Sequence, residues 1–133
     1  MAVVVADTHT LLWYQFDRGR LSVRATRSLD DCIAAAEPIR ISAISLVEIV
    51  YLVEKGRVRD DAIARFDSVL AAPGGGLLVV PVDAAISRTV QRVARAEVPD
   101  MPDRVIAATA LHLGVPLVTR DGRIRASGID TIW

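Results

Sequence analysis

The sequence has 133 residues, of which 52% are hydrophobic and 24% are charged, with 16 basic and 16 acidic side chains. This length and composition predict one folded domain over residues 1–133 and exclude a disordered chain. The formal net charge of zero means that any affinity for phosphate must be local. Cys32 is the single cysteine, which excludes an intramolecular disulfide and a thiolate metal cluster. Because no apolar run has the length of a membrane span or the form of a signal peptide, we expect a cytoplasmic protein.

The apolar pattern predicts strands that alternate with helices along the whole chain. In chain order we expect a strand over 3–6, helices over 8–16 and 22–37, a strand over 39–42, a helix over 45–55, another from 60 or 61, a strand over 77–80, helices over 83–97 and 102–112, a strand over 115–119, a short helix or turn over 122–127 and a strand over 129–132. This alternation predicts a three-layer α/β/α sandwich with a mainly parallel central sheet. Right-handed crossovers then place the carboxyl ends of the strands along one edge, where such folds bind their ligands.

Four acidic residues stand where predicted strands end or predicted helices begin. Asp7 directly follows the first strand, and Asp121 lies just beyond the strand over 115–119. Glu48 and Asp103 each lie in the first turn of a predicted helix. All four are therefore expected at the same edge of the sheet, where their side chains can converge.

Each of these acids also has an ordinary structural explanation. Asp7 could cap the helix that follows it, and Ser45 with Glu48 fits a capping box. Asp103 would interact favourably with a helix dipole, and Asp121 with the glycine after it could form a tight hairpin turn. The functional interpretation rests on the four acids together, because neighbouring carboxylates repel one another unless a cation neutralises them.

A ligand set made only of carboxylate oxygens selects Mg²⁺ or Mn²⁺ over Zn²⁺. Such an ion commonly serves phosphoryl chemistry, in which it activates water and clamps a phosphodiester. The sequence therefore predicts metal ligation by Asp7, Glu48, Asp103 and Asp121, with Asp100 as an additional candidate in the preceding loop.

Four segments of the chain, over 5–13, 41–49, 102–110 and 117–121, resemble the PIN-domain family in order and spacing, and within it the VapC-type toxins of bacterial toxin–antitoxin pairs. The resemblance implies a PIN-like α/β/α fold and a Mg²⁺- or Mn²⁺-dependent endoribonuclease. It also implies inhibition by a VapB-type antitoxin, a homodimer and a higher toxin–antitoxin complex.

The resemblance carries over to individual acids. Asp7, Glu48, Asp103 and Asp121 match the catalytic and metal-binding quartet of the family, and Asp100 matches an additional acid often seen before the helix. Many relatives carry a histidine ahead of that helix. This chain has Val98-Pro99-Asp100-Met101-Pro102 instead, so no role of that histidine can be assigned here.

Several neighbours are candidates for supporting roles. The hydroxyls of Ser42, Ser45 and Thr119 could hydrogen-bond a carboxylate ligand. Arg104 and Arg120 flank two of the acids and could hold RNA phosphates or balance charge.

Two further features of the predicted helices bear on function. His9 is expected to have a structural or supporting role, because it follows Asp7 without being one of the acids. The helices over 8–16 and 45–55 are apolar on more than one face, which indicates a thick core. In the family such helices also form the antitoxin groove and contribute to dimerisation.

Two other functions fit parts of the pattern. A non-catalytic PIN fold that binds RNA or a protein partner would need no acidic quartet, and here all four positions are acidic. An aspartate-based phosphatase or phosphoacceptor domain usually has a lysine near the phosphoryl group. The sole lysine, Lys55, is expected at a helix end far from the acids.

Overall fold

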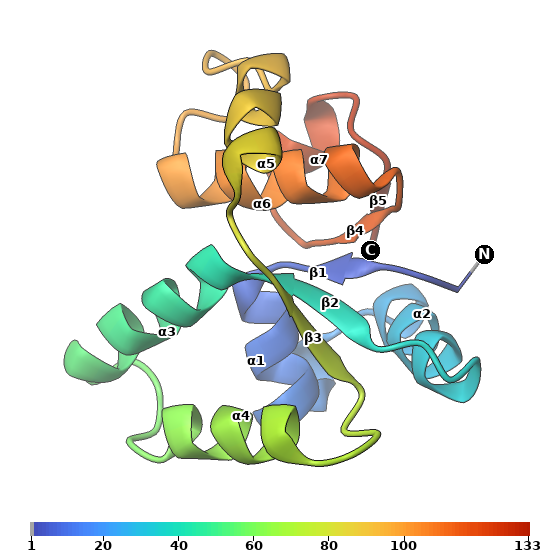
Figure 1. The fold of residues 1–133 in the computed structure, drawn as a ribbon, viewed down its shortest axis with the longest axis vertical. Coiled ribbons are helices and arrows are strands. Elements are labelled where there is room, and N and C mark those ends of the chain that lie inside the picture. The colour runs from blue at the N-terminus through green and yellow to red at the C-terminus, as the bar shows by residue number, and fades with distance from the viewer. Residues whose placement is uncertain (1) are drawn as a thin grey trace.

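The computed structural model describes residues 2–133 and contains a five-stranded sheet in the order β3-β2-β1-β4-β5, with every neighbouring pair parallel (Figure 1). The strands are β1 (Val5–Ala6), β2 (Ile39–Ser42), β3 (Leu77–Val80), β4 (Leu117–Val118) and β5 (Thr131–Ile132). The α-helices are α1 (Thr8–Phe16), α2 (Val23–Ala34), α3 (Ala43–Glu54), α4 (Ala62–Ala71), α5 (Ala84–Thr89), α6 (Met101–Leu113) and α7 (Gly122–Ala126), with 3₁₀ turns η1 (Arg18–Arg20) and η2 (Val90–Arg92).

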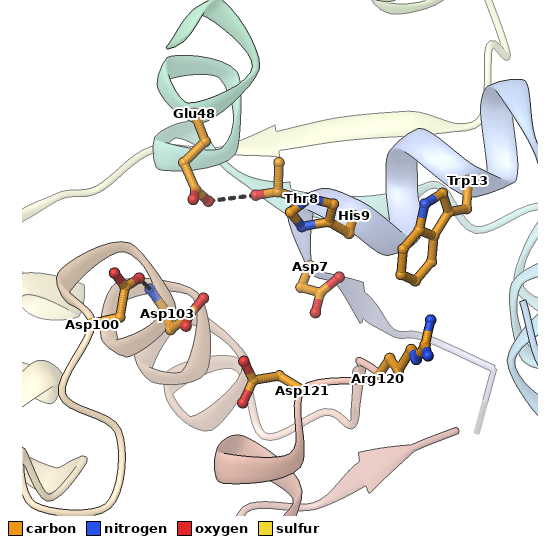
Figure 2. A pocket seen from close by; sticks show the side chains of 9 residues that line it. All are labelled: Asp7, Thr8, His9, Trp13, Glu48, Asp100, Asp103, Arg120 and Asp121. Atoms are coloured by element: carbon orange, nitrogen blue, oxygen red, sulfur yellow. Dashed lines mark hydrogen bonds between the residues drawn. The ribbon is translucent and has the colours of Figure 1, made fainter. Parts of the chain in front are cut away.

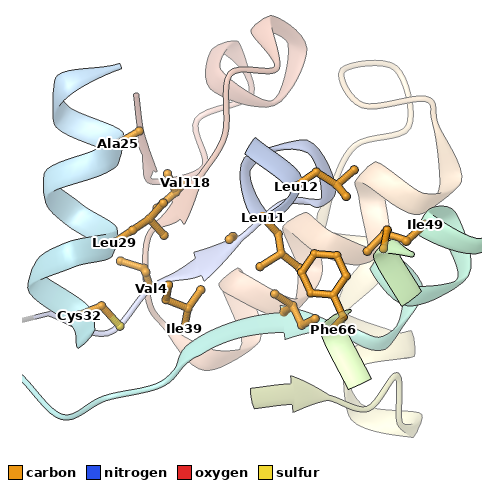
Figure 3. Packing of buried hydrophobic residues seen from close by; sticks show 13 residues of the cluster. Val4, Leu11, Leu12, Ala25, Leu29, Cys32, Ile39, Ile49, Phe66 and Val118 are labelled. Atoms are coloured by element: carbon orange, nitrogen blue, oxygen red, sulfur yellow. The ribbon is translucent and has the colours of Figure 1, made fainter. Parts of the chain in front are cut away.

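The helices cover both faces of the sheet and form two apolar cores. One core lies between the sheet and α1 to α4 and contains Leu11, Leu29 and Phe66 (Figure 3). The other lies between the sheet and α5 to α7. Val4 packs in the first core and its neighbour Val5 in the second, because successive side chains of a strand point to opposite faces. Burial on both faces explains why the N-terminal strand is apolar without alternation.

This architecture confirms the predicted α/β/α sandwich with a parallel sheet. The bounds of α1, β2 and β3 match the prediction. Helix α6 ends at Gly114 as expected, and this glycine adopts a left-handed conformation with φ 68°. Ser22 caps α2 by accepting a hydrogen bond from the backbone N–H of Ala25 at 3.0 Å.

The predicted start of α3 is wrong by two residues. The helix begins at Ala43, and its cap is Ser42, whose hydroxyl accepts from the N–H of Ile44 at 3.2 Å. Ser45 therefore lies inside the helix, and the predicted capping box between Ser45 and Glu48 does not form. Because Ser42 ends β2, the chain turns directly from strand to helix and brings Glu48 over the edge of the sheet.

The predicted helix over 83–97 is also shorter in the structure. Its cap is Asp83 as expected, but α5 ends at Thr89 and tightens into η2. Arg104 explains the end of this segment, since its guanidinium donates to the carbonyls of Val90 and Val93 at 2.7 to 3.1 Å. These bonds satisfy carbonyls that helix continuation would otherwise occupy.

No helix in the part of the chain from residue 2 to residue 133 is both long enough and apolar enough to cross a membrane.

Candidate active site

The parallel register brings the acids together at the carboxyl edge of the sheet. Ala6 pairs with Ile41 on one side and Val118 on the other, so the chain leaves β1, β2 and β4 at the same level. A pocket of about 490 Å³ opens there (Figure 2). Its lining residues are Asp7, Thr8, His9, Trp13, Glu48, Asp100, Asp103, Arg120 and Asp121.

Asp7 both caps α1 and faces the pocket, so its two interpretations are compatible. Its Oδ1 accepts from the N–H of Thr10 at 2.8 Å, and its Oδ2 accepts from the hydroxyl of Thr119. Burial raises the pKa of Asp7 above its ordinary value, and the bonds from Thr119 and Thr10 oppose that rise. The carboxyl is thereby fixed in orientation between β1 and β4.

Glu48 reaches the pocket from α3 and is held by the first residue of α1. Thr8 Oγ1 lies 2.6 Å from Glu48 Oε1 and 2.9 Å from the hydroxyl oxygen of Ser45. An ionised carboxylate can only accept, so the single hydroxyl proton of Thr8 goes to Glu48 and its oxygen lone pairs face Ser45. Partial burial raises the pKa of Glu48, which the bond from Thr8 opposes.

Asp103 and Asp100 approach from the start of α6. Asp100 caps the helix, and its Oδ2 accepts from the N–H of Asp103 at 3.2 Å. Burial, together with the charges of Asp100, Asp121, Glu48 and Asp7, raises the pKa of Asp103 to about 7. The charges of the other acids thus contribute to the raised pKa of Asp103, and Asp100 is a pocket residue as well as a cap.

Asp121 begins α7, so the alternative of a hairpin turn at this position is wrong. Its Oδ1 accepts from the N–H of Arg123 at 2.9 Å and of Ile124 at 3.0 Å. Its own N–H donates to the hydroxyl of Thr119 at 3.0 Å. Thr119 is completely buried and thus connects Asp7 to the backbone of Asp121.

The supporting residues predicted from the sequence divide into three groups. Thr119 and Ser45 contact the acids or their partner Thr8. Ser42 is buried but serves as the α3 cap, and the guanidinium of Arg104 is directed to the η2 carbonyls. Arg120 lines the pocket and is exposed to solvent.

Sequence reasoning missed two residues of this pocket. Thr8 was not proposed, although it orients Glu48, because the two are separated by 40 positions and only the fold brings them together. Trp13 lies in the helix over 8–16, which the sequence predicts to be apolar on more than one face, yet its ring is only partly buried and lines the pocket. Trp13 lies six positions after Asp7, which is about 120° away around the axis of α1, so helical spacing gave no signal for this shared surface.

The chemistry of this donor set fits a hard divalent cation. The lining contains five carboxylates and one arginine, and within residues 2–133 no ion pair joins any of those acids to a basic side chain. Carboxylate oxygens are the ligands that Mg²⁺ and Mn²⁺ prefer. Over the same residues, no three acidic, histidine or cysteine side chains are grouped closely enough to hold a metal ion as they stand.

The fold and this pocket define a class of proteins. The PIN domain model matches residues 4–128, and the chain belongs to the PIN domain family. The predicted resemblance to this family is thereby confirmed. In sequence, the chain is 28% identical over 126 residues to Ribonuclease VapC22 of Mycobacterium tuberculosis, covering 95% of this chain and 92% of the relative.

Solved structures share the same fold. VapBC2 from Rickettsia felis, bound to a DNA fragment from its promoter, matches with a TM-score of 0.71 at 17% identity over 98% of this chain and 99% of that one. FitAcB from Neisseria gonorrhoeae matches with a TM-score of 0.65 at 21% identity over 97% and 96%. A toxin–antitoxin complex from Klebsiella pneumoniae matches with a TM-score of 0.65 at 20% identity over 98% and 96%.

Proposed function

We propose that this chain, taken as one PIN domain over residues 1–133, is the toxin of a toxin–antitoxin pair and a Mg²⁺- or Mn²⁺-dependent endoribonuclease. The observation that carries the proposal is the convergence of Asp7, Glu48, Asp103 and Asp121 on one pocket from four separate segments. A relative named as a ribonuclease and fold neighbours named as toxin–antitoxin complexes support it.

The acids would hold the cation through their oxygens, with Asp7 at the centre of the group. When bound, the divalent ion offsets the charge of the carboxylates and of the scissile phosphate and activates water for hydrolysis. Thr119 and Thr8 fix the carboxyls of Asp7 and Glu48. Asp103, whose pKa is raised to about 7, would have to lose its proton to become a ligand, so cation binding should strengthen as the pH rises through neutrality.

The proposal includes a VapB-type antitoxin and a homodimer as partners. An apolar strip on the outside of α3 supports such contacts, since Val47 is 50% exposed and Tyr51 is 59% exposed. Ile49 on the same helix is buried in the core. The structure thus separates the apolar residues of α3 into an inner set that packs and an outer set available to a partner.

RNA cleavage by the purified protein, freed of co-purifying antitoxin, tests this proposal. We expect fragments with Mg²⁺ or Mn²⁺ and none with EDTA or with the Asp7→Asn variant. Asp67→Asn, which changes an exposed acid on α4 outside the pocket, is the matched control and should cleave normally. Growth inhibition that persists in an Asp103→Ala variant would instead support the non-catalytic binding module.

A further inference from the structure

The pocket has an aromatic and basic side in addition to its acids. Trp13 from α1 and Arg120 from the turn after β4 lie on the far side of Asp7 from Asp103, and His9 from α1 lies next to Asp7 and Thr8 (Figure 2). None of these three is needed to hold a cation. This side of the pocket therefore requires a separate explanation.

The indole of Trp13 is held in place by its neighbours. Its ring centroid lies 6.0 Å from that of Trp133 in an edge arrangement and 5.7 Å from the ring of His9. Aromatic pairs at such separations stabilise one another beyond the effect of the area they bury. Trp13 remains only partly buried and still lines the pocket, so it offers a preformed aromatic surface to a ligand.

Arg120 supplies a positive charge beside that ring. Its guanidinium carbon lies 5.8 Å from the Trp13 centroid, and its side chain is exposed. Within residues 2–133 the ion pairs are made by other arginines, and Arg120 neutralises none of the nearby acids. An arginine that stands next to five pocket acids without pairing with them is available to a phosphate.

We propose that Trp13 and Arg120 form a binding subsite for one nucleotide of single-stranded RNA, immediately beside the acidic centre. The base stacks on the indole, and the guanidinium contacts the adjoining phosphate. This inference rests on the proposed function, because it places the substrate of that activity. The nucleotide in this subsite must be unpaired, because a base inside a duplex cannot reach an aromatic side chain.

A second groove continues from the subsite and gives the strand a path. His9 and Trp13 line both the acidic pocket and a groove of about 360 Å³, whose charged residues are Arg20, Arg57, Arg59 and Asp17. Arg20 pairs with Asp17 and Arg59 pairs with Asp61, whereas Arg57 makes no ion pair within residues 2–133. A strand leaving the acids across Trp13 would therefore enter a region with a modest excess of positive charge. That change of charge along the path favours a nucleic acid over an acidic or neutral ligand.

The fluorescence of Trp13 tests the stacking directly. The chain has two tryptophans, so Trp133→Phe leaves Trp13 as the only one. We expect a short single-stranded RNA to quench this fluorescence with Ca²⁺ in place of Mg²⁺. An abasic strand of equal length carries the same charge without bases and should bind more weakly without quenching. Equal affinity for both strands, or RNA binding without quenching, would overturn the inference.

Substitutions separate the two halves of the subsite. Trp13→Ala should weaken RNA binding roughly 5- to 150-fold, the range found for one stacked base, and Trp13→Phe should retain part of the affinity. Arg120→Gln should reduce the slope of the logarithm of the binding constant against the logarithm of salt concentration by about one, as expected for the loss of one phosphate contact. Arg120→Lys should restore the parent slope. Tyr14→Ala and Arg123→Gln are the matched controls, because neither residue lines the pocket.

The outcomes distinguish this inference from the proposed function. If folded Trp13→Ala binds and cleaves RNA like the parent while Asp7→Asn is inactive, the subsite is wrong and the nuclease stands. If Trp13→Ala weakens only the binding of a protein partner, the surface is a protein interface and the subsite is again wrong. If RNA quenches Trp13 but no cleavage occurs with Mg²⁺ or Mn²⁺, the subsite stands and the nuclease is wrong.

Discussion

The raised pKa of Asp103 leads to a prediction about stability without metal. An acid whose pKa is raised on folding keeps its proton in the folded state over a range where the unfolded chain has lost it. Stability therefore falls as the pH rises from the ordinary value of 3.8 to about 7, and the full penalty remains above that window. Asp103→Asn, which cannot ionise, should therefore stabilise the metal-free protein at pH 8.

The size of this effect follows from the shift. A rise from 3.8 to about 7 corresponds to a ceiling of about 4 kcal/mol. Asp103 is only partly buried, so solvent screening reduces this to about 1 to 2 kcal/mol. Asp103→Asn also loses the favourable interaction of a negative charge with the start of α6, which lowers the expected stabilisation by a few tenths of a kcal/mol. For a chain of this length, the remaining stabilisation corresponds to an increase in Tm of roughly 2 to 6 °C.

Thermal unfolding in EDTA at pH 8 and pH 4 measures this difference. We expect Asp103→Asn to melt above the parent at pH 8 and close to it at pH 4, with Asp67→Asn unchanged at both. Adding Mn²⁺ at pH 8 should stabilise the parent more than the variant, because the parent has the additional ligand. A variant less stable than the parent at pH 8 in EDTA, or a gain of equal size at pH 4, would refute the reasoning.

Two further substitutions test residues around the acids. Thr119→Val removes the hydroxyl that bridges Asp7 and the N–H of Asp121. It should lower the free energy of unfolding by about 1 to 3 kcal/mol. It should also lower the affinity for Mn²⁺ by about 10- to 100-fold. The control is Thr109→Val, which removes a buried hydroxyl bonded within α6 and should leave the affinity for Mn²⁺ unchanged. An equal loss of Mn²⁺ affinity in the two variants would contradict the role of Thr119. Arg104→Gln should destabilise the fold by about 2 kcal/mol in urea unfolding through its lost carbonyl bonds, without the change in RNA affinity that a phosphate contact would produce.

Much of the fold was predictable because local and global signals agree. The doubly buried β1, the cap at Ser22 and the left-handed Gly114 are each encoded by a few adjacent residues. The carboxyl edge of the sheet followed from strand and helix alternation, and the five acids of the pocket were all candidates from the sequence. These features depend on chain order more than on side-chain packing.

The errors arose where two local solutions compete or where the contact is tertiary. Ser42 and Ser45 are three positions apart, and either could cap α3; the end of β2 decides for Ser42. The contacts of Thr8 with Glu48 and of Arg104 with Val93 join separate segments, and nothing local specifies them. Arg104 flanks an acid in sequence, yet its guanidinium is turned toward η2 and satisfies backbone carbonyls there.

The central claim is that the acids at the end of β1 and around it form one metal-dependent site for RNA hydrolysis. The most direct measurement is the initial rate of RNA cleavage as a function of Mn²⁺ concentration, for the parent, Asp7→Asn and Asp67→Asn in parallel. The account predicts saturable activation of the parent and of Asp67→Asn, and a rate at least about 100-fold lower for Asp7→Asn at every Mn²⁺ concentration. Cleavage that persists in EDTA, or an Asp7→Asn variant that Mn²⁺ activates like the parent, would contradict it.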